Sequence, residues 1–265
     1  IDLEQYVTKF ITATNDDDIV KQLDKLANDV IEPYIDQCYA ELAEDVNAFQ
    51  QKMKMKREAI ANKGIWTGKK HYILNVFNNE GVQYAKPKLK MQGIEAVRSS
   101  TPAACRENIK KALEVIMNET EDAAIEFIEN FRNEFVKLPF EQVAFPRSVQ
   151  NIDKWRNGDQ PKPACPIHVR GTIVFNTLLK QKNLTNKYNP VVDGDKIKFC
   201  YLLLPNNVQQ NVISTSGILP PEFGLEQFID YDTQFNKSFL EPLKTILDKI
   251  GWKTEKSFTV EDFFQ

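Results

Sequence analysis

The residues of this chain that could act on another molecule are mostly basic, and they are concentrated in one segment. Residues 1–51 hold twelve acids against three bases, a balance of −9, whereas residues 52–98 hold eleven bases against three acids, a balance of +8. The formal net charge of the whole chain is only −3 and hides this contrast. A cationic segment inside an acidic chain predicts a local surface that attracts a polyanion to one face.

Two adjacent lysines stand at the mouth of a predicted strand, in the run Lys69-Lys70-His71-Tyr72. Neighbouring residues of a strand point to opposite faces, so both lysines can meet one phosphate only where the strand is just beginning. Two cations beside an aromatic ring could grip a DNA backbone and reach into a minor groove. A pair of solvated lysines is the alternative, and composition favours neither.

The carboxylates are better explained by structure than by metal binding. The acids at 16–18 suit the positive end of a helix dipole, and those at Asp230 and Asp232 have the neighbours of a solvated helix surface. Glu58 differs, because it is the only acid in residues 52–70. It is either an ion-pair partner, which spacing favours, or a group near a metal-phosphate site.

Other chemistries find little support in the sequence. Neither His71 nor His168 has a serine or cysteine elbow nearby, and the sequence contains no Walker loop and no GxGxxG motif. The cysteines form no CxxC pair, which favours reduced thiols over disulfides or zinc. These four residues are Cys38, Cys105, Cys165 and Cys200.

Membrane insertion and export are not indicated either. The best apolar run, Phe199–Leu204, is far too short to cross a bilayer. The first ten residues include Asp2, Glu4 and Lys9, which argues against a secretory signal, and the opening Ile1 suggests a processed or trimmed product. We expect a cytoplasmic protein.

Hydrophobic periodicity predicts an α+β fold. Apolar positions from Ile19 to Val46 recur every three to four residues, which predicts a long amphipathic helix bent at Pro33. Tyr72–Phe77 and Val82–Ala85 predict a hairpin closed by the turn at 78–81, so the bases decorate a sheet.

The second half is predicted to be mainly helical with a small sheet. Phe127, Phe131 and Phe135 have helical spacing and are assigned to a core rather than to base stacking. The predicted elements are helices at 102–117, 121–138 and 225–250, the last bent at Pro242, and strands at 168–175 and 196–204.

Several blocks of sequence, in the same order, closely resemble the family B replicative DNA polymerases of T-even-like phages. Together they span nearly the whole chain. The blocks are Lys56–Ile60 with Lys69–Val76, Ala85–Lys90 with Gly93–Pro102, Cys165–Gly171, Lys237–Leu243 and Phe258–Phe264.

The resemblance implies roles for residues of the cationic segment. Glu58 corresponds to a palm carboxylate close to the metal-binding aspartates of the family. Lys69, Lys70 and Tyr72 correspond to a motif that contacts primer-template DNA, and His71 replaces the arginine usual there. Further contacts are expected from Lys88, Lys90 and Arg98.

Later blocks imply a thumb and a tail. His168, Arg170 and Gly171 would lie near the duplex backbone; Ala164 stands where the family often has a lysine, so Lys162 or Arg170 would carry that contact. The tail resembles a sliding-clamp-binding peptide, although the same side chains could cap the thumb's own core. The tail side chains are Phe258, Val260, Phe263 and Phe264.

By resemblance, residues 1–98 are the end of the palm, 99–257 the thumb and 258–265 the clamp-binding tail. The paired aspartates that hold catalytic Mg²⁺, the exonuclease domain and the fingers would lie in an N-terminal polymerase portion outside this sequence. The chain alone is therefore expected to bind no metal or cofactor and to be inactive. Its expected partners are primer-template DNA, that N-terminal portion and a sliding clamp, in the cytoplasm of an infected bacterium.

Two rival functions stay open at this stage. One is an accessory DNA-binding protein that never joins a polymerase. The other is a metal-dependent nuclease that would combine Glu58 with the acids at 16–18, and it is disfavoured because no acidic cluster lies within the basic segment.

Overall fold

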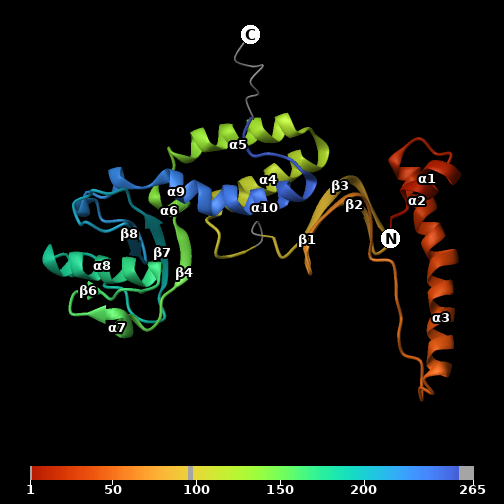
Figure 1. The fold of residues 1–265 in the computed structure, drawn as a ribbon, viewed down its shortest axis with the longest axis horizontal. Coiled ribbons are helices and arrows are strands. Elements are labelled where there is room, and N and C mark those ends of the chain that lie inside the picture. Colours follow the sequence, from red (N-terminus) through yellow and green to blue (C-terminus); the bar gives the residue numbers. More distant parts are fainter. Residues whose placement is uncertain (1, 95–97, 257–265) are drawn as a thin grey trace, which may run out of the picture. The chain divides into compact units, whose positions relative to one another are not determined.

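A computed structural model describes residues 2–94 and 98–256. It has an α+β fold made of helices and small antiparallel sheets, as the sequence predicts (Figure 1). The chain divides into two compact units, Ile1–Gln92 and Gly93–Gln265, called unit 1 and unit 2 below. No helix in the described ranges is both long enough and apolar enough to cross a membrane.

Unit 1 begins with helices. The short α1 (Glu4–Phe10) precedes a nearly continuous helix formed by α2 (Asp16–Leu26), the π-helical turn η1 (Ala27–Ile31) and α3 (Glu32–Asp45). Asn15 caps α2, since its side chain accepts a hydrogen bond from the Asp18 backbone N–H at 2.8 Å. The acids at 16–18 lie in the first turn, so their assignment to the helix dipole is confirmed.

A π-helical turn precedes each of the two prolines at which the sequence predicts a helix bend. Pro33 follows the π turn η1, and Pro242 follows a second π turn, η5 (Asn236–Leu240), at the start of α10 (Glu241–Ile250). Proline has no N–H to donate, and its ring crowds the carbonyl four residues earlier. A wider turn just before the proline relieves that crowding, so the two bends predicted from the sequence take the form of π turns.

Strands β1 (Ala59–Gly68), β2 (His71–Asn79) and β3 (Val82–Gln92) form the antiparallel sheet of unit 1, in the order β1-β2-β3. The predicted hairpin is confirmed, but β3 runs well beyond its predicted end. Residues 84–87 bulge out opposite a single β2 residue, and this bulge contains Pro87. Strand β1 was not predicted, because its centre lacks the alternation and β-branched residues that mark strands.

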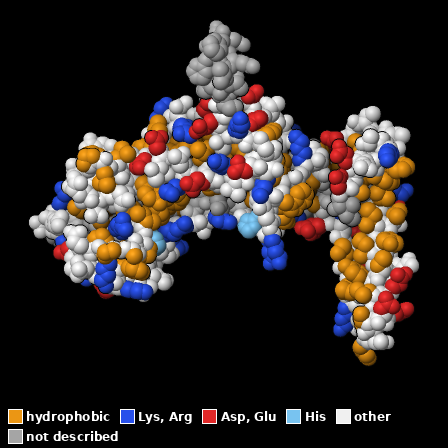
Figure 2. Space-filling view, viewed as in Figure 1, with side chains coloured by type: hydrophobic (Ala, Val, Ile, Leu, Met, Phe, Trp, Pro, Cys, Tyr) orange, Lys and Arg blue, Asp and Glu red, His pale blue; other side chains and the backbone are white. Residues whose placement is uncertain are grey.

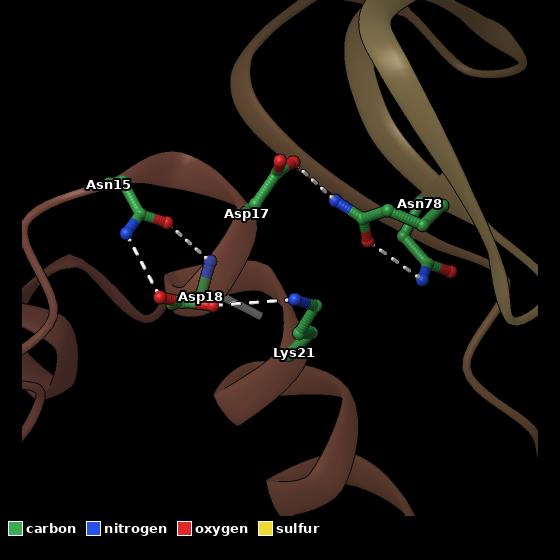
Figure 3. A network of polar contacts seen from close by, with 6 residues as sticks. Asn15, Asp17, Asp18, Lys21 and Asn78 are labelled. Carbon is green, nitrogen blue, oxygen red and sulfur yellow. Dashed lines mark hydrogen bonds and ion pairs between the residues drawn. The ribbon is translucent and has the colours of Figure 1, made fainter.

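Polar side chains tie the α2 helix to the sheet. Gln83 of β3 donates a hydrogen bond to Asp17 at 3.1 Å and accepts one from Asn78 of β2 at 3.4 Å (Figure 3). Arg57, just before β1, forms an ion pair with Asp24 of α2. These contacts hold the first strand and the hairpin beside the same helix.

The helices of unit 2 enclose a phenylalanine core. α4 (Ala103–Asn118) and α5 (Glu121–Phe135) are the predicted helix pair, and α9 (Tyr231–Phe235) and η5 pack beside them. Rings of Phe131, Phe135, Phe235 and Phe239 lie 4.7–5.7 Å apart between centroids, and all four side chains are buried. The prediction that these phenylalanines form a core rather than a base-stacking surface is confirmed for Phe131 and Phe135.

A second antiparallel sheet completes unit 2, in the order β4-β7-β8. Its strands are β4 (Phe145–Ser148), β7 (Lys196–Tyr201) and β8 (Val212–Thr215), and helix α8 (Ile167–Gln181) packs on β8. The smaller elements are α6 (Phe140–Val143), α7 (Ile152–Trp155), the two-residue strands β5 (Arg156–Asn157) and β6 (Gln160–Pro161), and 3₁₀ turns at Pro221–Phe223 and Glu226–Phe228.

One predicted strand is wrong, because residues 168–175 lie inside helix α8. The segment is rich in β-branched residues, which favoured a strand. However, the apolar run continues to Leu179, too far for a buried strand, and Pro166 immediately precedes the first helical turn. Eight residues of α8 are buried, so tertiary packing overrides local strand propensity here.

Gly171 sets the distance between α8 and β8. A Cβ at this position would lie 2.8 Å from the Ser214 backbone nitrogen and 2.9 Å from the Ile213 carbonyl carbon. Gly171→Ala is therefore expected to lower the free energy of unfolding by about 1–3 kcal/mol, because backbone cannot yield as a flexible side chain can. Gly217→Ala, with nothing within 4 Å, is the matched control and should change it by less than about 0.5 kcal/mol in urea denaturation.

Candidate nucleic-acid interface

The register of β2 with β3 places two of the predicted DNA-binding lysines on one face of the sheet. Lys90 lies opposite Leu74, and Lys88 lies opposite Val76. Tyr72, two residues before Leu74, shares that face because side chains alternate along a strand. We call the side that carries Tyr72, Lys88 and Lys90 the lysine face. Ile73 points to the other side, and both sides hold buried residues, Val76 on the lysine face and Ile73 on the other.

Lys69 and Lys70 lie at the end of this sheet rather than within it. They form the two-residue connection between β1 and β2, both are exposed, and Lys70 has a left-handed backbone with φ +63°. The Nδ1 atom of His71 lies 2.8 Å from the Lys69 carbonyl oxygen and closes the turn. Strand β2 begins only at His71, which is the condition under which both lysines can approach the same phosphate backbone.

Trp66 is a residue of the lysine face that sequence reasoning missed. It pairs with Tyr72 across the β1–β2 ladder, and 63% of its surface is exposed. A Cβ on Gly64 would lie 2.6–2.9 Å from the Trp66 ring and the Leu74 side chain, so the indole occupies the space that a side chain at this position would need. The available signal was a tryptophan three residues before a lysine pair, in a segment not recognised as a strand.

Glu58 is held by one of these lysines. Lys90 Nζ donates to the Glu58 carboxylate and, at 2.9 Å, to the Asn79 side chain. The hydrogen bond to Glu58 raises the pKa of Lys90, although partial burial opposes the shift. The ion-pair interpretation of Glu58 is confirmed with Lys90 as its partner, because the neighbouring Arg57 is paired with Asp24.

The other lysines of the sheet retain their charge for an external partner. Lys88 lies 4.5 Å from the centroid of the Tyr84 ring, which positions it without neutralising it. Lys63, Lys69, Lys70 and Lys86 are exposed, and none of them forms an ion pair with another residue of the described ranges. Exposed, uncompensated ammonium groups around an exposed indole are suited to an anionic, partly aromatic ligand.

The predicted site residues of unit 2 are positioned by helix α8. The His168 carbonyl accepts hydrogen bonds from Ser214 Oγ at 2.8 Å and Thr172 Oγ1 at 3.0 Å, and its ring centroid lies 6.3 Å from that of Phe199. Arg170 is partly exposed. Gly171 is buried against β8, so its contribution is the packing of α8, and a direct contact with DNA stays a prediction.

His168 is electrostatically distinct from the lysines. Burial lowers its pKa first, and the nearby positive charge of Arg147 lowers it further. The imidazole is therefore neutral at pH 7, and any hydrogen bond that it makes to a phosphate comes from a neutral donor.

Two further predicted residues have local backbone contacts. Lys162, named as a substitute for the lysine missing at Ala164, donates to the Lys154 carbonyl at 2.7 Å. Arg98 is exposed, and its guanidinium donates to the Gly93 carbonyl at 3.1 Å. The tail residues Phe258, Val260, Phe263 and Phe264 lie outside the described residues.

The acids do not assemble into a metal site. Within residues 2–94 and 98–256, no group of three or more His, Cys, Asp or Glu side chains is placed to hold a metal ion. Asp18 is engaged by Asn15 and Lys21, and Asp17 by Gln83 (Figure 3). The described residues therefore do not fit a resident Mg²⁺ ion.

Two known proteins that are similar to this chain have the same name, DNA-directed DNA polymerase. The sequence model described as DNA polymerase family B matches residues 33–157. The chain is 30% identical to the DNA-directed DNA polymerase of Enterobacteria phage T4 and 35% identical to that of Escherichia phage RB69, over 93% and 91% of its length. It is a homologue of the phage family B DNA polymerases. It spans 28% of the length of each of these two polymerases.

The state of His168 gives a prediction for the pH dependence of stability. A histidine whose pKa is lowered by folding favours the native state above its unfolded pKa of about 6.5, and this contribution is lost as the pH falls below that value. We expect His168→Gln to reduce the loss of thermal stability between pH 7.5 and 5. Arg147→Gln, which removes the second cause of the shift, should reduce it by less. An equal loss in the wild type and His168→Gln would contradict the assignment.

Proposed function

We propose that this chain is the part of a family B DNA polymerase that grips the primer-template duplex and positions the primer end for phosphoryl transfer. In this proposal unit 1 is the end of the palm, with the palm extending to about residue 98, and residues 99–257 form the thumb. The observation that carries the proposal is the lysine face, on which Lys88, Trp66 and Tyr72 are exposed or half-exposed, together with the exposed Lys69 and Lys70 at the end of the sheet.

Phosphate contacts explain how such a surface would hold DNA. Each lysine that neutralises a phosphate releases counterions, which gives affinity without sequence preference. Phosphate contacts also fix the register and orientation of a protein on a duplex. A polymerase needs this combination, because it must hold any sequence while keeping the primer end aligned.

The aromatic side chains add contacts of a different kind. The exposed Trp66 ring, supported from below by Gly64, can pack against a sugar or an unpaired base near the primer end. Tyr72 lies beside it across the ladder and can reach a groove edge through its hydroxyl group. These contacts do not depend on charge, so they can be separated experimentally from those of the lysines.

Unit 2 would contribute a second set of backbone contacts. Arg147 supplies positive charge near His168, which is expected to act as a neutral donor, and Arg170 supplies positive charge near Cys165. Arg98, at the junction, would add one more cationic contact.

Catalysis would depend on residues outside the sequence. Positioning alone contributes strongly to phosphoryl transfer, and the family's chemistry uses divalent metal ions that stabilise the attacking and leaving oxygens. The described residues supply positioning, with Glu58 in a supporting role through Lys90. We therefore expect no nucleotide addition by this chain without the rest of the polymerase.

An accessory DNA-binding protein is the alternative function. It would use the same lysine face but would not associate with an exonuclease-and-fingers portion. Co-purification with such a portion from infected cells would decide for the polymerase. A nuclease is not supported, since Glu58 is paired with Lys90 while Asp17 and Asp18 are engaged by other side chains.

The lysine pair is tested by the salt dependence of duplex binding. Replacing both Lys69 and Lys70 by Ala is expected to flatten the slope of log K against log salt by about 0.9 for each lost phosphate contact. Fluorescence anisotropy with labelled primer-template DNA at several salt concentrations measures this slope. An unchanged slope would remove both lysines from the interface.

Two comparisons make that measurement specific. The double variant Lys182→Ala and Lys249→Ala removes the same charge from exposed positions of unit 2 and should leave the slope unchanged. Trp66→Ala carries no charge change, and it is expected to weaken binding by about tenfold with the slope retained.

We also propose that the C-terminal residues bind a sliding clamp, in the cytoplasm of an infected host. The support is the apolar side chains of Phe258, Val260, Phe263 and Phe264 beyond the last helix. Phenylalanines buried in a partner's pocket contribute about 1.5–3 kcal/mol each.

The tail proposal has its own test. Deletion of residues 258–265 is expected to abolish binding to the clamp while the melting temperature and duplex binding stay as in the full chain. If the deletion instead lowers the melting temperature by several degrees, these phenylalanines belong to the core of unit 2.

A further inference from the structure

Helix α3 of unit 1 leaves its apolar side uncovered. None of its residues is buried, although its sequence is amphipathic. Large apolar side chains recur every four residues with Cys38 between them, which places them in one row along the helix. Their exposed fractions are 56% for Val30, 67% for Tyr34, 45% for Leu42 and 63% for Val46. Figure 2 shows hydrophobic side chains along this helix, with acidic side chains beside them.

The row extends beyond the end of the helix. Phe49 is fully exposed, and Met53 and Met55 are about half exposed on the segment that follows. We call Val30, Tyr34, Cys38, Leu42, Val46 and Phe49 the α3 stripe. An exposed row of apolar side chains such as the α3 stripe is typical of a surface that binds another protein.

Charge restricts what can cover the α3 stripe. Helix α3 carries five acids and no base (Glu32, Asp36, Glu41, Glu44 and Asp45). Such a polar flank repels nucleic acid and anionic lipid, which bind amphipathic helices through basic flanks. A second copy of the chain would bring two acidic flanks together, which is unfavourable. The complementary surface is therefore that of a different protein segment, apolar at its centre and neutral or basic at its rim.

The comparison with the relatives indicates which protein that is. The chain spans 28% of each phage polymerase to which it is similar, and these polymerases align with α3 as well as with the later elements. Most of such a polymerase lies outside this sequence, in the same or another polypeptide. We propose, resting on the function proposed above, that the α3 stripe is the docking surface for this remaining polymerase portion.

The stripe can be changed without disturbing the fold. Its side chains are exposed, and glutamine is at least as good a helix former as tyrosine or valine. The variant Tyr34→Gln, Leu42→Gln and Val46→Gln removes three members while keeping α3 and its net charge. The matched control is Val136→Gln, Val192→Gln and Ile218→Gln, which removes exposed apolar side chains of unit 2.

The test measures the affinity of the full chain for the separately expressed remainder of its polymerase by biolayer interferometry. We expect the stripe variant to bind at least about tenfold more weakly, with wild-type affinity for the control. Templated primer extension by the mixture should fall in parallel. Duplex binding by the stripe variant alone should be unchanged, so a failure of the DNA-gripping function and a failure of docking give different results.

Three outcomes would overturn the docking proposal. The first is equal affinity of the stripe variant and the wild type for the remainder, or no binding by either. The second is a wild-type dimer in sedimentation velocity that the stripe variant abolishes, which assigns the surface to a second copy. The third is slow hydrogen exchange of α3 in the isolated chain that becomes fast in the stripe variant, which assigns it to unit 2.

Discussion

Antiparallel pairing of β2 with β3 is the constraint on which the proposed interface depends. It sets Lys88 and Lys90 beside Tyr72 on a single face, and the β1 register adds Trp66 to the same side. A shift of one residue would send both lysines to the opposite face. The bulge at 84–87 interrupts the ladder only beyond these pairs, where Pro87 could not have donated a ladder hydrogen bond.

In unit 2, the close contact between the backbones of α8 and β8 positions the predicted site residues. Gly171 allows α8 to lie directly against Ser214, and that contact fixes where His168 and Arg170 emerge from the helix. Burial, and after it the charge of the nearby Arg147, then lower the pKa of His168. In the proposed function, the two units would contribute different chemistry to DNA binding: exposed ammonium groups in unit 1, and a half-buried imidazole in unit 2.

The helices of the two units differ in how far their apolar side chains are buried. Unit 2 buries Phe131, Phe135, Phe235 and Phe239 in a core, whereas α3 buries none of its apolar side chains. Most of the stability of an amphipathic helix comes from packing of its apolar face, so a helix whose apolar face is exposed to water is only marginally stable. This exposure is the observation behind the proposal that the α3 stripe docks onto the remaining polymerase portion, since the chain spans 28% of the length of the two phage polymerases.

The sequence by itself determined the α+β class, the hairpin, the helix pair of unit 2 and the concentration of positive charge, because periodicity, turn residues and net charge are local properties. It also identified the polymerase family from ordered motifs. It could not show that residues 168–175 are helical, since burial in α8 outweighs their β-branched side chains. Nor could it show that Lys90 is held by Glu58, or that the Trp66 ring packs over Gly64. The first relationship joins residues far apart in the chain and the second depends on where a side chain packs, so only strand register and close packing decide them.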